Sequence, residues 1–194
     1  MGRGTEAVTP EVGPQAAAAE QLRGTDLKRF HRAQRRGLGL GGTREVTIVC
    51  DGVQDPVNVG AIFRIADAVR AHEVVLAGSS AVPGPGQRLL QATSRGKEAI
   101  VPWRHEPQAA QAILSLAAAG VPACAIEIAA DAIPYTVAEY PPRLALVVGG
   151  EEYGITRRAL AACPLRVFVP MLGRGRSLNV AVSLAVVAYR VILE

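Results

Sequence analysis

The chain has 194 residues, a length that fits one domain, and its 49% hydrophobic but only 4% aromatic composition predicts an aliphatic core. Its net charge of +4 weakly favours an anionic partner, because many proteins this basic bind no polyanion. The three cysteines are widely spaced, which argues against a zinc site and fits reduced thiols in the cytoplasm. Residues 1–24 lack the apolar segment of a signal peptide, so we expect a cytoplasmic protein.

Residues 1–43 are expected to form a mobile tail and a short basic helix. Thr25 is placed to cap a helix over residues 26–36, whose cations are Lys28, Arg29, Arg32, Arg35 and Arg36. Such a helix is typical of an arm that grips phosphates, and the alternative is a solvated helix face. The glycine-rich run at 37–42 precedes the first strand, whereas a dinucleotide-binding loop follows one, so we interpret it as a hinge.

From residue 44 onward, strand and helix patterns alternate, which predicts an α/β domain with a mainly parallel sheet over residues 44–194. Asn58 and Ser177 are placed to cap the helices that follow them. Segments 78–96 and 131–142 are rich in glycine, proline or serine and are expected to be loops. The expected strands are 46–50, 73–77, 99–103, 122–128, 144–148 and 165–169, and the expected helices are 59–71, 107–119, 156–163 and 180–189.

The last of these helices is apolar on every side from Val180 to Tyr189 except at Ser183. A helix that is apolar all round must be buried all round, and one core of this size can hardly cover it. We therefore expect part of it to face a second subunit. The run is far shorter than the ~20 residues that span a bilayer, so a membrane segment is not expected.

Three polar loops follow expected strands and carry the residues most typical of a site. They span 55–64 with Asn58 and Arg64, 149–154 with Glu151, and 173–179 with Ser177 and Asn179. None contains a histidine, which argues against a Ser-His-Asp hydrolase, and no carboxylate cluster indicates Mg²⁺ or Ca²⁺. Group transfer without a metal, with arginine as the electrostatic element, fits these residues better. A plain surface arginine is the alternative for Arg64.

These loops resemble the three motifs of the SpoU/TrmH family of RNA ribose 2′-O-methyltransferases, in the SPOUT superfamily. The first motif is matched by Asn58, Gly60 and Arg64, and the second by Gly149, Glu151 and Gly154. The third is matched by Pro170, Met171 and Gly173, followed by Ser177 to Val180. Glu152 stands where the family often has glycine, and nothing in the sequence explains this difference.

The resemblance implies a parallel sheet whose C-terminal part forms a deep trefoil knot, a homodimer, and S-adenosylmethionine as cofactor without a metal. The cofactor would contact Gly149, Val169, Leu178, Met171 and Gly173, with Glu127 or a neighbour at the end of its strand a further contact. Arg64 would hold the phosphate beside the target ribose and help to deprotonate or polarise its 2′-hydroxyl, with Glu151 orienting Arg64. Asn58, Ser177 and Asn179 would shape the pocket.

The substrate implied by the resemblance is tRNA or rRNA, and two groups of basic residues are expected to bind it. One is the arm of residues 26–36, and the other comprises Arg95, Arg174 and Arg176 in polar loops. The alternative function is a non-catalytic RNA-binding member of the same fold. An unrelated hydrolase or dinucleotide enzyme would require all three motif matches to be fortuitous.

Overall fold

A computed structural model describes residues 21–37 and 44–193 of the chain. The chain divides into two compact units, residues 1–41 and 42–194. In the first unit, α1 (Gly24–Gly37) confirms the basic helix expected over residues 26–36, and its described side chains are exposed. Most of the expected tail, most of the glycine-rich hinge, and the side chains of Arg35 and Arg36 lie outside the described residues.

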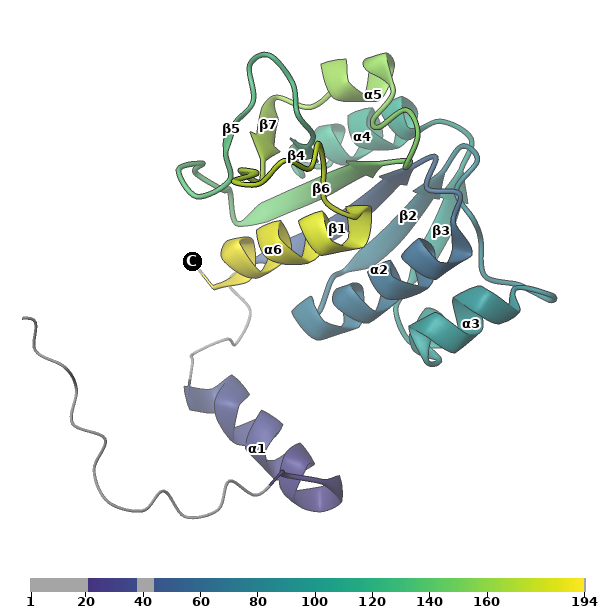
Figure 1. The fold of residues 1–194 in the computed structure, drawn as a ribbon, viewed down its shortest axis with the longest axis vertical. Coiled ribbons are helices and arrows are strands. Elements are labelled where there is room, and N and C mark those ends of the chain that lie inside the picture. Colours follow the sequence, from purple (N-terminus) through teal and green to yellow (C-terminus); the bar gives the residue numbers. More distant parts are fainter. Residues whose placement is uncertain (1–20, 38–43, 194) are drawn as a thin grey trace, which may run out of the picture. The chain divides into compact units, whose positions relative to one another are not determined.

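Within residues 44–193, seven parallel strands form one sheet in the order β3-β2-β1-β6-β4-β7-β5 (Figure 1). The central strands are continuous apolar runs because helices cover the sheet on both faces. This confirms the predicted α/β class, while the trefoil knot stays a prediction. The strands are β1 (Glu45–Asp51), β2 (Glu73–Ala77), β3 (Trp103–Glu106), β4 (Ala123–Ile126), β5 (Ile133–Pro134), β6 (Arg143–Gly149) and β7 (Leu165–Phe168).

Two layers of helices cover the sheet (Figure 1). On one face, α2 (Pro56–Val69), α3 (Arg88–Ser94) and α6 (Val180–Ile192) pack around a core that includes Ile48, Phe63, Leu146 and Leu184. On the other face, α4 (Ala109–Ala118) and α5 (Arg157–Ala161) pack around Val49, Ile113 and Val147. Neighbouring residues of β1 and β6 therefore point into opposite cores, as the period of a strand requires.

Several expected boundaries are wrong. The segment 78–96, expected to be a loop, contains α3, and a 3-10 turn (Lys97–Ala99) occupies the start of the strand expected at 99–103. The connector 131–142 contributes the edge strand β5. Asp55, not Asn58, caps α2, since its carboxylate accepts the Val57 N–H at 2.8 Å. The cap of α6 is Asn179, not Ser177, and accepts the N–H groups of Ala181 and Val182.

The missed helix α3 explains the glycine of the first loop. A Cβ on Gly60 would lie 2.7 Å from the carbonyl oxygen of Leu90 and 2.8 Å from the Cβ of Thr93. Gly60 is therefore needed for α2 and α3 to pack closely, because only the absence of a side chain permits this distance. Leu90 itself is fully buried in the core that α3 shares with α2.

Helix α6 is buried on one face only within this chain. Leu184, Val187 and Val191 are fully buried, whereas Val182 and Tyr189 remain 48% and 44% exposed. The expectation that the helix is buried all round therefore does not hold for a single chain. An apolar stripe at helical spacing stays open to solvent at Val182, Val186, Tyr189 and Leu193, with Val186 half-buried.

Candidate functional site

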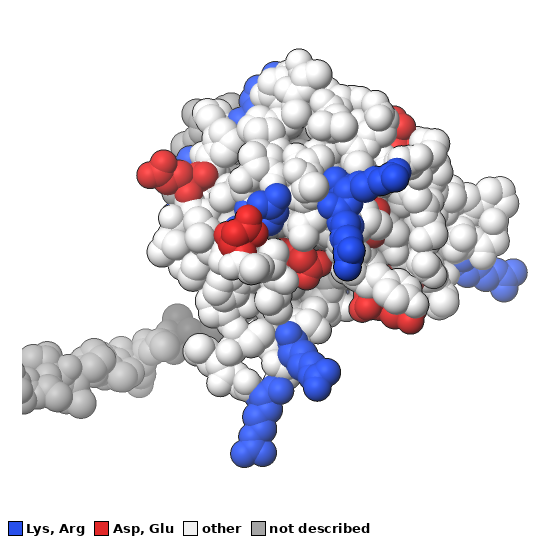
Figure 2. Space-filling model, turned by 90° about the horizontal axis from the view of Figure 1, so that it is seen from above, with Lys and Arg blue, Asp and Glu red and all other residues white. Residues whose placement is uncertain are grey.

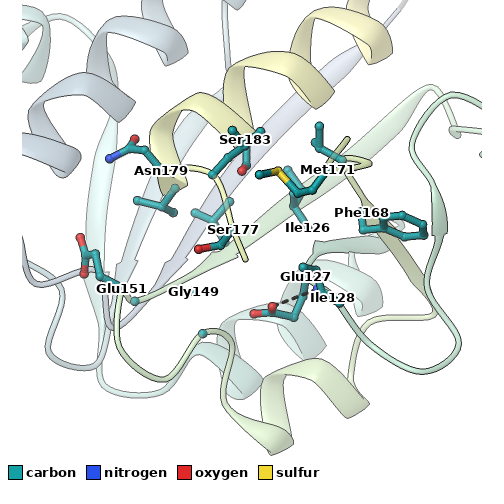
Figure 3. Close-up of a pocket in the computed structure, with 16 residues that line it drawn as sticks. Ile126, Glu127, Ile128, Gly149, Glu151, Phe168, Met171, Ser177, Asn179 and Ser183 are labelled. Carbon is teal, nitrogen blue, oxygen red and sulfur yellow. Dashed lines mark hydrogen bonds between the residues drawn. The ribbon is translucent and has the colours of Figure 1, made fainter. Parts of the chain in front are cut away.

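The carboxyl ends of β4, β6 and β7 border a cavity of about 420 Å³, which the segment before α6 and the first turn of α6 close (Figure 3). Crevices at this edge of a parallel sheet are the usual place for ligands. Its lining combines apolar side chains with several polar groups from separate elements. The cavity is lined by Ile126, Glu127, Ile128, Val148, Gly149, Gly150, Glu151, Gly154, Phe168, Val169, Met171, Ser177, Leu178, Asn179, Val180 and Ser183.

Most residues predicted to form the site do line this cavity. They are the predicted cofactor contacts Glu127, Gly149, Val169, Met171 and Leu178, together with Glu151, Ser177 and Asn179. Gly173, Asn58 and Arg64 are not among the lining residues. The expected contact at Glu127 or a neighbour at the end of its strand includes Ile126, the last residue of β4. Phe168 and Ser183 were not predicted. Their positions at the end of β7 and in the first turn of α6 could have indicated them.

Gly149 ends β6 and Gly150 follows it, and both allow close packing of the backbone. A Cβ on Gly149 would lie 2.0 Å from the carbonyl carbon of Gly154, and one on Gly150 would lie 2.3 Å from the carbonyl oxygen of Gly52. These glycines let three backbone segments approach one another, and the cavity wall is built from that contact.

Glu127, at the end of β4, ties this wall together. Its carboxylate accepts the N–H of Ile128 and the N–H of Ile155, each at 3.0 Å. A Cβ on Gly154 would lie 2.4 Å from one oxygen of the same carboxylate, and Gly154 has a φ of +64°. Two features therefore favour glycine at 154: its left-handed backbone conformation and the close approach of the Glu127 carboxylate.

A chain of side-chain hydrogen bonds joins the three polar loops. The Asn58 amide donates to the Glu151 carboxylate at 2.6 Å, and the Asn179 amide donates to the Asn58 carbonyl oxygen at 2.8 Å. The Asn179 oxygen in turn accepts two N–H groups at the start of α6. Asn58 is buried, so both halves of its amide need partners, and this chain supplies them. The three loops therefore hold one another in place at the rim of the cavity.

Arg64 stands apart from this network. It is exposed on α2 and forms no hydrogen bond or ion pair within the described ranges 21–37 and 44–193. The direct contact between Glu151 and Arg64 that we expected does not occur, and the Glu151 carboxylate accepts the Asn58 amide instead. Among the described residues, none pairs with the Arg64 guanidinium.

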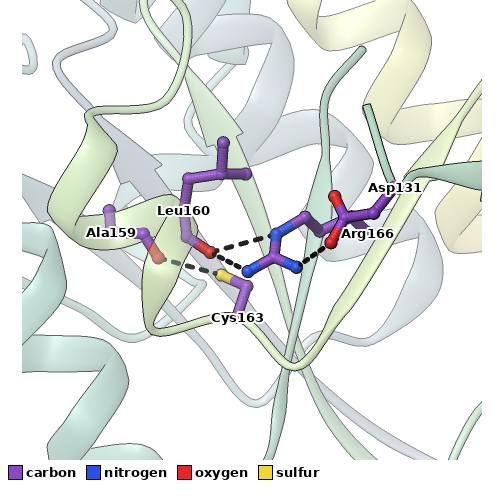
Figure 4. A network of polar contacts seen from close by, with 5 residues as sticks. All are labelled: Asp131, Ala159, Leu160, Cys163 and Arg166. Carbon is purple, nitrogen blue, oxygen red and sulfur yellow. Dashed lines mark hydrogen bonds and ion pairs between the residues drawn. The ribbon is translucent and has the colours of Figure 1, made fainter. Parts of the chain in front are cut away.

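Strand β7, whose end lines the cavity, is anchored by Arg166 (Figure 4). This guanidinium donates to the Leu160 carbonyl at the end of α5, from Nε and from Nη2, and pairs with Asp131 at 2.5 Å. The nearby Cys163 thiol donates to the Ala159 carbonyl at 3.2 Å. Burial raises the pKa of Cys163 to about 12, so this thiol stays protonated at neutral pH.

The buried cysteines take no part in the site as nucleophiles. Burial also raises the pKa values of Cys50 and Cys124 to about 12, with the negative charge of Glu151 a smaller cause at Cys50. All three cysteines are free and buried in the structure, and buried thiols of this kind pack as small apolar groups. Across the described part of the chain, no three His, Cys, Asp or Glu side chains gather as a metal would require, and no helix is long and apolar enough to cross a membrane.

The predicted RNA-binding arginines outside α1 are exposed in the structure. Arg95 ends α3 in a left-handed conformation with a φ of 54°, and Arg174 and Arg176 lie in the segment between β7 and α6. On the face drawn in Figure 2, lysine and arginine side chains stand singly or in pairs with carboxylates between them. That face therefore carries no continuous basic patch.

Comparison with known proteins agrees with the geometry. Residues 45–189 match the model of the SpoU rRNA Methylase family. The tRNA (guanosine(18)-2′-O)-methyltransferase of Escherichia coli is 30% identical over 75% of this chain and 62% of its own length. The 23S rRNA (guanosine(2553)-2′-O)-methyltransferase RlmP of Bacillus subtilis is 33% identical over 77% of this chain and 58% of its own. A solved RNA 2′-O ribose methyltransferase superposes with a TM-score of 0.67 at 28% identity, over 77% of this chain and 56% of that one. The chain thus spans about three fifths of these relatives.

Proposed function

Because the chain belongs to the SpoU rRNA Methylase family, we propose that it transfers a methyl group from S-adenosylmethionine to a ribose 2′-hydroxyl of tRNA or rRNA. The observation that carries this proposal is the hydrogen-bonded chain from Glu151 through Asn58 to Asn179 at the rim of the cavity. One residue from each of the three polar loops takes part in it. Such a network fixes the rim in one geometry, which group transfer between two bound molecules requires.

The cavity fits the cofactor in size and in chemistry. Its volume of about 420 Å³ lies in the range of small-molecule sites, and the apolar side chains in its lining suit an adenine ring. The Glu127 carboxylate holds two backbone N–H groups and retains lone pairs for ribose hydroxyls. We assign the binding to Gly149, Val169, Met171 and Leu178 with Glu127. When bound, the cofactor supplies a methyl group already activated on a sulfonium.

The roles that we propose for the chain's own polar residues are those that the family resemblance implies. A ribose 2′-hydroxyl is a poor nucleophile until its proton is removed or polarised. Arg64, exposed and without a partner among the described residues, would bind the phosphate beside the target ribose and stabilise developing charge on the oxygen. A guanidinium has a pKa above 12, so its electrostatic role fits better than a role as base. Asn58, Glu151, Ser177 and Asn179 would shape and fix the pocket.

Two measurements test the proposal in order. Calorimetry with S-adenosylmethionine should give saturable binding at one site per chain. Transfer of tritium-labelled methyl from the cofactor to bulk tRNA and bulk rRNA, followed by nuclease digestion, should yield a labelled 2′-O-methyl nucleotide. Cofactor binding without transfer to either RNA would indicate the non-catalytic alternative, and no binding at all would contradict the proposal.

We further propose that the chain acts in the cytoplasm as a homodimer in which the open stripe of α6 is covered by a second copy. Val182→Glu should then convert the dimer to a monomer, because burying an unpaired charge costs several kcal/mol. The free energy of unfolding of a single chain should change little, since Val182 is 48% exposed in it. Light scattering and thermal melting measure the two effects separately.

Leu114→Glu is the matched control for this substitution. Leu114 is a 54% exposed apolar residue on α4, on the opposite face of the sheet. Its replacement by glutamate should leave the mass in solution unchanged. A Val182→Glu protein that remains dimeric would show that the stripe is not the interface.

The basic arm is proposed to bind RNA through its phosphates. Replacing Lys28, Arg29, Arg32, Arg35 and Arg36 by glutamine should keep α1 helical and spare cofactor binding. RNA affinity should fall, and the slope of log affinity against log salt should flatten by roughly 0.7–0.9 for each phosphate that the arm no longer neutralises. An unchanged affinity and slope, measured by filter binding at several salt concentrations, would leave the helix as a solvated face.

A further inference from the structure

Tyr153, in the turn that follows β6 beside the cavity, is 83% exposed. The other exposed aromatic residues of the described ranges are less open, with Phe30 at 45%, Tyr189 at 44% and Trp103 at 36%. An aromatic ring contributes strongly to a core when it is buried, and this chain has few aromatic residues. Packing within the chain therefore does not account for tyrosine at this position.

The turn that carries Tyr153 is held rigidly at its base. The Gly154 N–H donates to the Gly150 carbonyl at 2.9 Å, and the Gly150 N–H donates to the Asp51 carbonyl at 2.9 Å. Just after the turn, the Thr156 N–H donates to the buried Asp51 carboxylate at 2.8 Å. These bonds close a tip of three residues, 151–153. An exposed ring on a fixed backbone loses little conformational entropy when it binds a partner.

The first residue of this tip belongs to the proposed active site. Glu151 lines the cavity and accepts the Asn58 amide at 2.6 Å, whereas Tyr153 is not among the lining residues and stays open to solvent. The phenol ring is thus presented outside the cavity, two residues along the chain from its rim. A molecule that places one group in the cavity would bring its next part to this ring.

Charge decides what kind of group the ring can receive. Glu151 and Glu152 precede Tyr153 in the tip, and both are exposed. Their carboxylates repel phosphates, so a contact with the RNA backbone is disfavoured here. The face of a nucleobase is uncharged and stacks on aromatic side chains, which is how proteins bind unpaired bases of RNA.

We propose that Tyr153 is a stacking platform for an unpaired base of the substrate RNA at the rim of the cavity. This inference rests on the proposed methyl transfer to RNA. Tyr153 would thus bind an RNA base, a contact that none of the proposed catalytic residues makes.

Kinetics on variants of Tyr153 test the proposal. Tyr153→Ala should raise the RNA concentration needed for half-maximal single-turnover methylation by about tenfold, the scale expected when one base stack is removed. The rate at saturating RNA and the affinity for S-adenosylmethionine should stay within about twofold of wild type. Tyr153→Phe keeps the ring and should behave as wild type. An unchanged RNA dependence in Tyr153→Ala would overturn the proposal.

A fluorescence measurement gives a readout that does not depend on methylation. Tyr153→Trp, in a Trp103→Phe background that removes the only natural tryptophan, places one reporter at the tip. An unstructured RNA oligonucleotide should quench it, and an abasic oligonucleotide of equal length, with the same phosphates, should not. Equal quenching by both would mean a backbone contact and would overturn the proposal.

Two further outcomes separate this inference from its premise. If the wild-type protein labels no RNA but the reporter is quenched only by the oligonucleotide with bases, the stacking platform stands and the methyl transfer fails. If Tyr153→Ala changes the mass in solution, measured by light scattering, the ring packs against a second copy of the chain and the stacking proposal is overturned. Tyr153→Phe serves as the control in this measurement too.

Discussion

Gly149→Ala is expected to destabilise the protein strongly and to abolish cofactor binding. The new Cβ would lie 2.0 Å from the carbonyl carbon of Gly154 and 2.2 Å from the nitrogen of Ile155. Both are backbone atoms, which cannot rotate away from the new methyl group as a flexible side chain could. The Glu127 carboxylate also holds this segment in place through the Ile155 N–H. Overpacking of this kind costs about 3 kcal/mol or more, which corresponds to a fall of roughly 6–12 °C in Tm for a chain of this size.

Thermal melting and calorimetry with S-adenosylmethionine measure the two effects. Gly84→Ala is the control, because a Cβ at Gly84 meets no atom within 4 Å and its backbone does not need glycine. Its Tm and cofactor affinity should equal those of the wild type. If Gly149→Ala melted and bound cofactor as Gly84→Ala does, close packing of the second loop would not be what builds the cavity wall.

The sheet could be predicted because its central strands are continuous apolar runs. β1, β2 and β6 each pair on both sides and lie between two cores, so both faces of each strand must be apolar. The sequence shows this directly, and the predicted bounds at 73–77 agree with β2. Three polar loops at carboxyl ends of parallel strands must then meet at one edge. The resemblance to the three family motifs named eight of the sixteen cavity residues in advance.

What escaped prediction depends on contacts between distant segments. The helix α3 lies in a stretch with Gly84, Pro85 and Gly86 before it, and these residues hid a helix of only seven residues. It forms because Leu90 is buried in the core and because Gly60 allows close approach. Local propensity is a weak guide where tertiary packing of this kind decides.

The partner of each polar side chain was equally beyond the sequence. Asn58 was placed as a helix cap because asparagine often has that role, but Asp55 had already satisfied the start of α2. Because Asn58 does not cap the helix, its amide can hydrogen-bond to both Glu151 and Asn179, which lie 93 and 121 residues away along the chain. Spacing in a motif predicts which loops meet, whereas the hydrogen bonds between them follow from the packed structure.

Arg64→Ala is expected to lower the methylation rate by about 10²-fold or more, the scale for removing one preorganised electrostatic group. Stability and cofactor affinity should be nearly unchanged, because Arg64 is exposed, lines no part of the cavity and has no partner among the described residues. Surface substitutions of this kind shift stability by no more than about 0.5 kcal/mol. Single-turnover methylation, with cofactor binding and thermal melting alongside, measures all three quantities.

Two further variants show whether charge alone accounts for the effect. Arg64→Lys should also be slow, because a point-charge ammonium does not reproduce the planar fork that binds a phosphate through two parallel hydrogen bonds. Arg158→Ala removes an exposed arginine from α5, on the opposite face of the sheet, and should react as wild type.

RNA affinity should fall only modestly in either Arg64 variant, because the arm and the loop arginines remain. Near-normal turnover in Arg64→Ala would show that Arg64 is an ordinary surface arginine. Another group at the rim would then have to stabilise the charge that develops during transfer.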